Sequence, residues 1–155
     1  MPPYHMTDPL VLAAEATADL ALQTALTSIK AQQELLADKY IRLQGTLTIA
    51  LKNKTDNSDL VTKLTTAKTD IAATKALPNY TSKYDPVTRG LIDVSETSIN
   101  AALLLLAIEQ GVLDSLHASI SINVDTALTD KDANQKLIDS LTAALKAVKN
   151  AEKAS

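Results

Sequence analysis

Hydrophobic and polar positions alternate in steps of three and four residues along two long stretches of the chain. The first stretch carries Leu22, Leu26, Ile29, Gln33, Leu36, Tyr40, Leu43, Leu47 and Ala50 with Leu51. The second carries Ile99, Leu103, Leu106, Gln110, Leu113, His117, Ile120, Val124 and Ala127 with Leu128. This spacing is typical of the a and d positions of a heptad, where one helix packs against another. The pattern therefore predicts two long helices, each with one apolar seam.

Asp-Pro pairs precede both stretches and predict where these helices begin. Asp8 is followed by Pro9, and Asp85 by Pro86. An Asp side chain accepts hydrogen bonds from the free N–H groups of a first helical turn. Pro at the first helical position lacks an N–H that would have no partner there.

Two polar segments, residues 53–58 and 129–134, are interpreted as tight turns that carry N-cap residues for two shorter helices. We expect those helices at about Asp59–Leu77 and Asp132–Lys153, and the first long helix to end near Lys52. Their predicted seams consist of Leu60, Leu64, Ala67, Ile71 and of Leu137, Leu141, Ala144 with Leu145, and Val148.

A shift of 77 residues places the second half of the chain on the first without a gap. Asp8 then matches Asp85, Gln33 matches Gln110, and the Asn at 57 matches the Asn at 134. These matches fall on helix starts and on the seams, which are the positions that a repeated architecture conserves.

The sequence thus predicts an all-α protein, an antiparallel four-helix bundle of up-down-up-down topology built from two tandem helical hairpins. The hairpins are residues 8–77 and 85–154, joined by a linker at 78–84, in a single domain of residues 8–155. Residues 1–7 are interpreted as a disordered or tag-like N-terminus.

The third helix of this bundle has a second apolar stripe beside its seam. The stripe contains Val94, Ala101, Ala102, Leu105, Ile108, Val112 and Leu116. Its counterpart in the first half is more polar and contains Thr17, Ala21, Thr24, Ser28, Ala31 and Leu35. Because apolar residues on two faces are typical of an enclosed helix, we expect the third helix to be the most buried.

Composition restricts the chemistry of the chain but leaves its compartment open. There is no Cys, so no disulfide or thiolate, and the protein is expected to be soluble, either cytoplasmic or mature and secreted. The net charge of −3 argues against nucleic acid as a partner. The apolar run Ile99–Ile108 is about half of the ~20 residues that span a bilayer, so it predicts a buried helix segment rather than a membrane span.

Four polar side chains in the seams are candidates for a core polar layer. Gln33 and Gln110 occupy equivalent positions and are predicted to hydrogen-bond across the core, which would fix the helix register as a buried Asn does in coiled coils. Exposure near a helix end and ligand contact are the alternatives. Tyr40 and His117 form the next equivalent layer, with the Tyr hydroxyl as a partner for the imidazole.

Motifs for metal binding and catalysis are incomplete. The spacing of Asp114 and His117 resembles that of di-iron bundles, but the first half of the chain has no His counterpart. Residues 130–134 begin like a calcium loop, yet Gln135 and Leu141 stand where Gly and Glu are needed. We therefore expect no metal site, no cofactor and no enzymatic activity.

Helix lengths point to an uncovered apolar surface on the long helices. At 1.5 Å per residue the long helices reach roughly 65 Å and the short ones about 30 Å, so part of the long seams would lack a covering helix. The predicted partner-binding residues there are Leu22, Leu26, Ile29, Ile99, Leu103 and Leu106.

The leading functional hypothesis is a non-enzymatic interaction or assembly protein that forms a homo-oligomer or binds a protein partner through these stems. The alternative is a carrier that binds an apolar small molecule or lipid between its helices. An enzyme and a membrane-inserting protein are lesser hypotheses.

Overall fold

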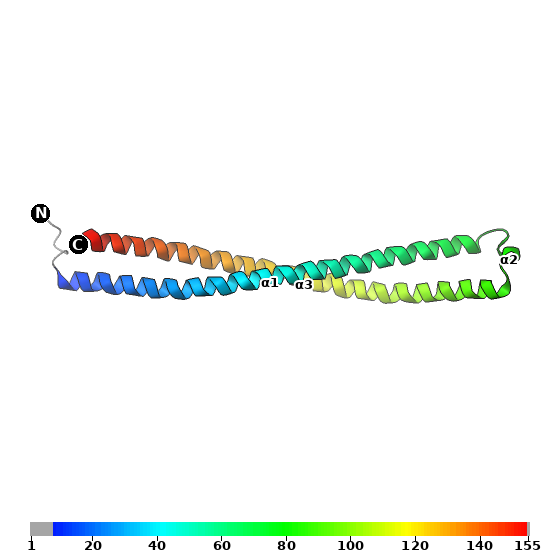
Figure 1. Ribbon diagram of the computed structural model, residues 1–155, viewed down its shortest axis with the longest axis horizontal. Coiled ribbons are helices and arrows are strands. Elements are labelled where there is room, and N and C mark those ends of the chain that lie inside the picture. The colour runs from blue at the N-terminus through cyan, green and yellow to red at the C-terminus, as the bar shows by residue number, and fades with distance from the viewer. Residues whose placement is uncertain (1–7, 155) are drawn as a thin grey trace. The chain divides into compact units, whose positions relative to one another are not determined.

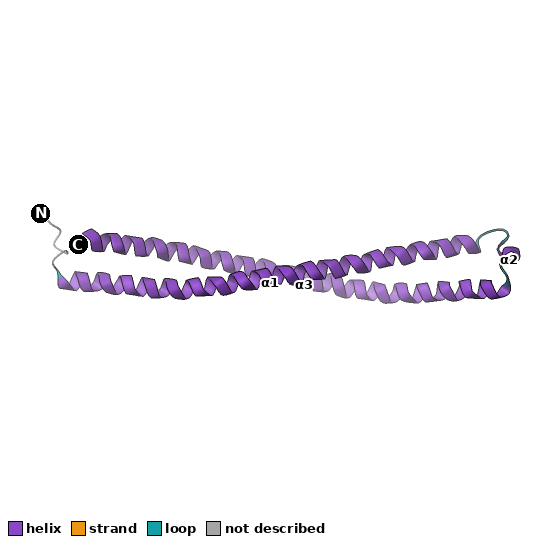
Figure 2. Cartoon of the chain, viewed as in Figure 1, coloured by secondary structure: helices purple, strands orange, loops and turns teal. Residues whose placement is uncertain are grey.

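The computed structural model describes residues 8–154, and every regular element in this range is helical (Figure 2). The elements are α1 (Pro9–Lys75), α2 (Tyr80–Lys83) and α3 (Pro86–Ala154), as labelled in Figure 1. The prediction of an all-helical protein is confirmed for these residues. The predicted N-terminal segment, residues 1–7, lies outside the described residues.

Both long helices begin where the Asp-Pro pairs predicted. The backbone N–H of Leu10 donates to Asp8 Oδ1 at 2.9 Å, and that of Thr88 donates to Asp85 Oδ1 at 2.7 Å. The hydrogen bond from the Thr88 backbone also lowers the pKa of Asp85, because it stabilises the ionised carboxylate. The N-terminal signals in the sequence were therefore sufficient to place both helix starts.

The two predicted turns are wrong, because residues 53–58 and 129–134 are helical in α1 and α3. Neither segment contains Gly or Pro, so nothing in the backbone forces the helix to stop. The side chains of Asn57 and Asn134, which lie in these segments, hydrogen-bond to the neighbouring helix. The described chain therefore has two long helices and one short one rather than the four helices of an up-down-up-down bundle.

Threonine hydroxyls bond to the backbone of their own helix in a part of α1 that is poor in strong helix formers. Thr62, Thr65, Thr66 and Thr69 each donate a hydroxyl hydrogen bond to the carbonyl four residues earlier, at 2.7–3.1 Å. Such bonds are compatible with a helix, although they weaken it slightly. The stretch is helical as far as Lys75.

The chain divides into two compact units. Unit 1 contains the residues up to Gln44 and those from Asn123 onward, whereas unit 2 is Gly45–Ile122 and includes α2. In each unit a segment of α1 packs against an antiparallel segment of α3. Contacts between increasing numbers in α1 and decreasing numbers in α3 establish that direction within each unit.

The predicted seams of the long stretches face the neighbouring helix and are buried or half-buried, apart from Leu51 and Leu128 at their ends. The most buried apolar residues are Leu26, Ala50, Val124, Ala127 and Ile138, which are 2–8% exposed. The seam expected for the shorter helices was wrong at two positions, because Leu60 and Leu137 are exposed. The heptad continues from the long stretches without interruption and places Val61 and Ile138 in the seam instead.

Gly45 offers a test of helix continuity, because a Cβ added there meets no atom within 4 Å. Gly45→Ala is expected to raise the free energy of unfolding by about 0.5–1 kcal/mol, since Ala loses less backbone entropy in a helix. Urea unfolding followed by circular dichroism measures this change. Gly45→Pro should instead be destabilising by ~3 kcal/mol. A loss of stability in the Ala variant would contradict a continuous α1.

Candidate interaction surface

The face of α3 opposite its packed seam carries a second heptad pattern within unit 2, here called the outer seam. It consists of Val87, Leu91, Val94, Ser98, Ala101, Leu105, Ile108, Val112, Ser115, Ser119 and Ile122. Every one of these residues is exposed. The spacing of three and four residues is the same as in the buried seam, so the outer seam has the pattern of a helix-packing surface, and no helix of residues 8–154 covers it.

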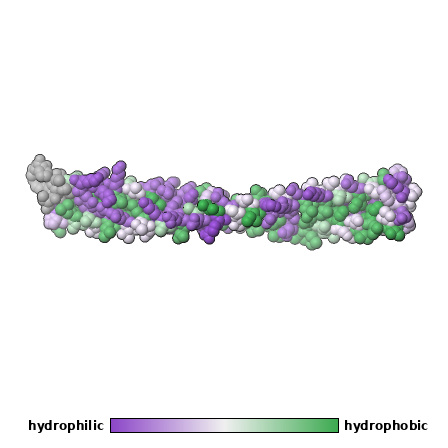
Figure 3. Space-filling model, in the orientation of Figure 1, coloured by the Kyte–Doolittle hydropathy of each residue, from purple (hydrophilic) through white to green (hydrophobic). Residues whose placement is uncertain are grey.

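The outer seam and its borders expose a large amount of apolar surface. Nine large apolar side chains of α3 between Val87 and Ile122 are 48–75% exposed, among them Leu105 at 69% and Ile108 at 68%. Contiguous apolar patches of this kind are uncommon on monomeric soluble proteins and mark binding surfaces. Apolar residues gather over unit 2 on the face shown in Figure 3, where unit 1 is more hydrophilic.

Charge is distributed unequally between the two edges of unit 2. The outer seam and the positions that border it between Val87 and Ile122 include one charged residue, Glu109. The corresponding outer face of α1 is rich in charged, exposed side chains and includes Lys52, Asp56, Asp59, Lys63 and Asp70. Unit 2 thus has one edge suited to water and one suited to an apolar partner.

The segment of α1 in unit 1 that matches the outer seam is much less apolar. Thr17, Thr24 and Ser28 occupy the positions of Val94, Ala101 and Leu105 after the 77-residue shift. Thr17 and Thr24 direct their hydroxyls to carbonyls of their own helix at 2.9 Å. The candidate surface is therefore particular to unit 2.

The expectation that the second stripe and the Ile99–Ile108 run would be buried is wrong. Val94 is 62% exposed and Val112 is 56% exposed, because α3 packs against one helix segment rather than at the centre of a bundle. By length and composition alone, α3 is the one described helix that could cross a membrane, through an 18-residue window of mean hydropathy 1.6.

A hydrogen-bonded pair, Asn57 with Gln110, lies in the buried seam of unit 2. Asn57 Nδ2 donates to Gln110 Oε1 at 2.7 Å and to the carbonyl oxygen of Leu106 at 3.2 Å. Asn57 is only 9% exposed, so its amide depends on these protein acceptors rather than on water.

Unit 1 contains the same arrangement, with residues shifted by 77 positions. Asn134 Nδ2 donates to Gln33 Oε1 at 2.7 Å and to the carbonyl oxygen of Ile29 at 3.2 Å. Gln33 and Gln110 are thus both hydrogen-bonded in a seam, but each pairs with an Asn and not with the other glutamine as predicted. Each meets an Asn because the helices run on through the segments that were interpreted as turns.

Tyr40 and His117, the other predicted members of the polar layer, belong to different units. The Tyr40 hydroxyl accepts a hydrogen bond from Gln44 Nε2 at 2.9 Å, and Lys131 Nζ lies 5.2 Å from the ring centroid. His117 is half-buried in the seam of unit 2. The four polar residues are therefore divided between two hydrogen-bonded seams.

The six predicted partner-binding residues are also divided. Leu22, Leu26 and Ile29 lie in the seam of unit 1. Ile99, Leu103 and Leu106 lie in the seam of unit 2. All six are buried or half-buried against the other helix segment of their own unit, so the exposed surface of α3 lies on the opposite face.

Ion pairs that the sequence reasoning missed join the helices of unit 2. Lys75 Nζ lies 2.8 Å from Asp93 Oδ1 and 3.4 Å from Glu96 Oε1, and the Asp93 carboxylate raises the pKa of Lys75. Lys54 Nζ lies 3.6 Å from Asp114 Oδ1. These ion pairs are partly exposed, so each adds little to the free energy of unfolding. They favour the observed pairing of α1 with α3.

Acidic and basic side chains also meet near the ends of the helices in unit 1. Lys149 Nζ lies 3.2 Å from Asp19 Oδ2. Hydrogen bonds from Gln23 and then Lys149 lower the pKa of Asp19 despite its burial. Burial, and then the neighbouring Asp19 carboxylate, raise the pKa of Glu152.

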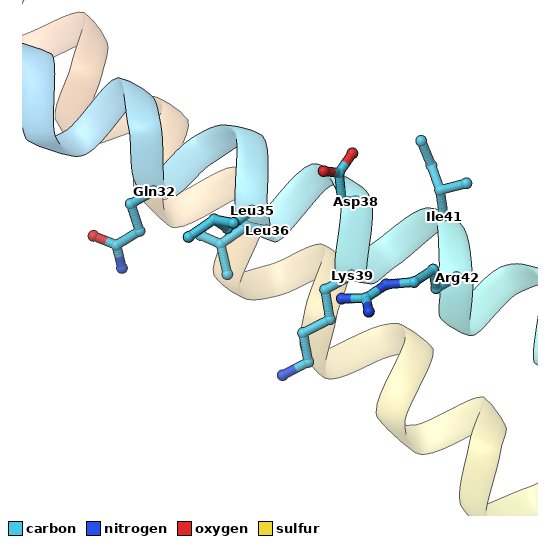
Figure 4. Close-up of a pocket in the computed structure, with 7 residues that line it drawn as sticks. All are labelled: Gln32, Leu35, Leu36, Asp38, Lys39, Ile41 and Arg42. Carbon is cyan, nitrogen blue, oxygen red and sulfur yellow. The ribbon is translucent and has the colours of Figure 1, made fainter.

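A groove runs along one helix of unit 1 (Figure 4). It is lined by Gln32, Leu35, Leu36, Asp38, Lys39, Ile41 and Arg42. All seven residues come from α1, so the groove lies on the surface rather than between helices. Among the described residues no cluster of three metal-ligating side chains occurs.

Comparison with protein-family models, with curated proteins and with solved structures found no match to this chain.

The two Asn–Gln pairs can be tested by a comparison of double variants. Asn57→Leu alone is expected to cost about 1–3 kcal/mol of unfolding free energy, because it leaves the Gln110 amide without its partner in the seam. Adding Gln110→Leu should recover most of that loss. Adding Gln33→Leu instead should deepen it, since that change breaks the other pair. Urea unfolding measures all three. Recovery by Gln33→Leu would contradict the observed pairing.

The raised pKa of Glu152 predicts how stability depends on pH. A folded-state pKa above the unfolded value means that stability is complete below the unfolded pKa and is lost as pH rises through the folded pKa. Glu152→Gln mimics the protonated side chain, so it should raise the thermal midpoint at pH 7. The difference from wild type should vanish below about pH 4, near the unfolded pKa of Glu.

Glu34→Gln provides the matched control for this experiment, because it makes the same charge change at an exposed position of α1 in unit 1. An equal rise in both variants would show that net charge, and not the environment of Glu152, governs the effect.

Proposed function

We propose that this protein is a non-enzymatic interaction or assembly protein, and that the outer seam of α3 in unit 2 is its docking surface. The observation that carries the proposal is a heptad-spaced, nearly uncharged helix face whose large side chains are mostly exposed. Exposure of such a face to water is unfavourable, so we expect a partner to cover it for much of the time.

The free energy of apolar burial indicates how much of the outer seam a partner must cover in order to bind. Burial of one large aliphatic side chain contributes ~1.5–3 kcal/mol when it is complete, and the side chains of the outer seam are already partly covered. Association costs an estimated ~4–15 kcal/mol before any net affinity appears. A partner that contacts two or three of these side chains would therefore bind weakly, whereas one that follows the whole seam would bind firmly.

The shape of the surface favours a helix as the partner. Steps of three and four residues place side chains in rows into which the side chains of another helix fit as knobs into holes. The apolar positions extend from Val87 to Ile122, which is about ten turns of helix. We infer that the partner presents a helix of similar length with an apolar face.

The arrangement also supports a finer account of the fold, in which the chain consists of two copies of one 77-residue sequence repeat. The support is that Gln33 with Asn134, and Gln110 with Asn57, have equal hydrogen-bond distances at positions related by this shift. On this account the predicted four-helix assembly is completed when a partner adds two helices to the two of unit 2.

The alternative function, a carrier of an apolar small molecule, has less support than assembly. A carrier needs a cavity between its helices that encloses most of the ligand. The groove in Figure 4 is lined by residues of a single helix, and the hollow that Leu36 of α1 and Leu137 of α3 line together is largely open to solvent. We therefore place the binding function on the outer seam.

A photo-crosslinking residue at position 105 tests the proposed function in the cells that make the protein. Leu105 is 69% exposed, so the replacement does not disturb the packed seam. The same residue at position 28, the exposed counterpart in unit 1, is the control. Covalent protein adducts are expected at position 105 and not at 28. Lipid adducts alone, or none at either position, would contradict the proposal.

A further inference from the structure

We propose that the partner of the outer seam is a second copy of this chain, docked antiparallel so that two α3 helices pack against each other. This inference rests on the proposed function and names its partner. The order of large and small residues along the seam, the position of its one bordering charge and the area that the seam exposes favour a second copy.

The outer seam is divided into blocks of large and small residues. Val87, Leu91 and Val94 are large, and Ser98 and Ala101 are small. A second large block follows at Leu105, Ile108 and Val112, before the small residues Ser115 and Ser119. A helix that packs firmly on this face must place small side chains against the large blocks and large ones against the small blocks.

An antiparallel second copy meets this requirement in one register at every opposition except one, where Val94 faces Val112 of the second copy. When Ala101 faces Leu105 of the second copy, Ser98 faces its Ile108, and Leu91 faces its Ser115. In each of these contacts, one of the two heptad positions of the outer seam faces the other heptad position in the second copy. Gln33 and Asn134 face each other in the same way in the buried seam of unit 1.

Shifts of one heptad in either direction spoil the fit. A shift one way places Ser98 against Ser115 of the second copy, which leaves a gap, and Leu91 against its Ile122, which crowds two large side chains. A shift the other way places Ala101 against Ser98 and Leu105 against Val94. The order of sizes therefore selects one antiparallel register of the chain with itself.

The charge on the border of the seam is compatible with this register. Glu109 is the one charged residue there, and a symmetric interface repeats it in both copies. In the selected register Glu109 lies beside Ser95 of the second copy, and the two Glu109 carboxylates are roughly 18 Å apart along the helix axis. At that separation the repulsion between exposed charges is largely screened.

The exposed area is sufficient for a stable dimer. Nine large apolar side chains per copy are 48–75% exposed. Together they offer on the order of 800 Å² per partner, which is the size of a standard specific interface. A symmetric dimer covers this area on both copies at once, so no second type of apolar surface is required.

A bilayer is a less favourable occupant of the same face. Unit 2 pairs α3 with a segment of α1 that contributes Lys54 and Lys75 to ion pairs and Asn57 to a hydrogen bond. Membrane insertion of α3 would take these groups toward the hydrocarbon or break their contacts, and either is costly. Docking of a second copy leaves all of them in place.

Sedimentation equilibrium of the full-length chain over a range of concentrations tests the dimer. The wild type is expected to reach twice the monomer mass, and Leu105→Glu is expected to weaken the dimer roughly 100-fold or more, because each interface would bury two carboxylates. Ser28→Glu, the matched change in unit 1, should leave the dimer intact. Circular dichroism checks that each variant remains helical.

A wild-type chain that stays monomeric at the highest concentration would overturn the second copy as partner. Protein adducts of a different mass at position 105 would then still support the proposed interaction function, so the two failures are distinguishable. Wild-type monomers that bind phosphatidylcholine vesicles through Leu105 would overturn both.

Disulfide cross-linking tests the antiparallel register, because the natural chain has no Cys. A mixture of Ser98→Cys and Ile108→Cys chains is expected to form a mixed disulfide dimer. Neither variant alone should cross-link, since each Cys would lie about 15 Å along the helix axis from the same Cys in the second copy. Cross-linking of either variant alone, with no mixed product, would overturn the antiparallel register.

Discussion

The hydrogen bond between a seam Asn and a seam Gln is the constraint on which each unit depends. Two helices with Leu, Ala and Val seams can slide past one another by a heptad with little loss of apolar burial. A displaced Asn57 would lose both Gln110 and the Leu106 carbonyl and leave a buried amide without a partner. The ion pairs of Lys75 with Asp93 and of Lys54 with Asp114 agree with the register that this amide sets.

That fixed register determines which surface of α3 is left exposed. Once Gln110 and Leu106 face α1, helical geometry turns Leu105 and Ile108 to the far side. A pair of helices cannot enclose a side chain, and no side chain in the described structure is fully buried. In unit 1 the equivalent face carries Thr24 and Ser28 and is suited to water, whereas in unit 2 it is apolar.

The sequence predicted the helix starts, the long seams and the places of Gln33 and Gln110 in those seams, because caps and heptads are local signals. It misplaced the partners of those glutamines, since Asn57 and Asn134 have the residue type of helix caps. An unbroken heptad through residues 50, 54, 57, 61 and 64 was the available sign that no turn intervenes. The interhelical ion pairs depend on the resulting register, so they could not be predicted while the turns were assumed.

The second stripe was the most informative pattern, although its burial within the chain was predicted wrongly. Heptad periodicity reports that a face packs against something and does not report whether the covering helix belongs to the same chain. In this chain the buried seam of α3 is covered by α1, and the outer seam has no covering helix among the described residues. On the proposed antiparallel dimer, α3 becomes the central helix that its two apolar faces indicate, with α1 on one side and the second α3 on the other. The two apolar faces in the sequence then match the helix packing of the dimer, and a single chain supplies half of the packed helices.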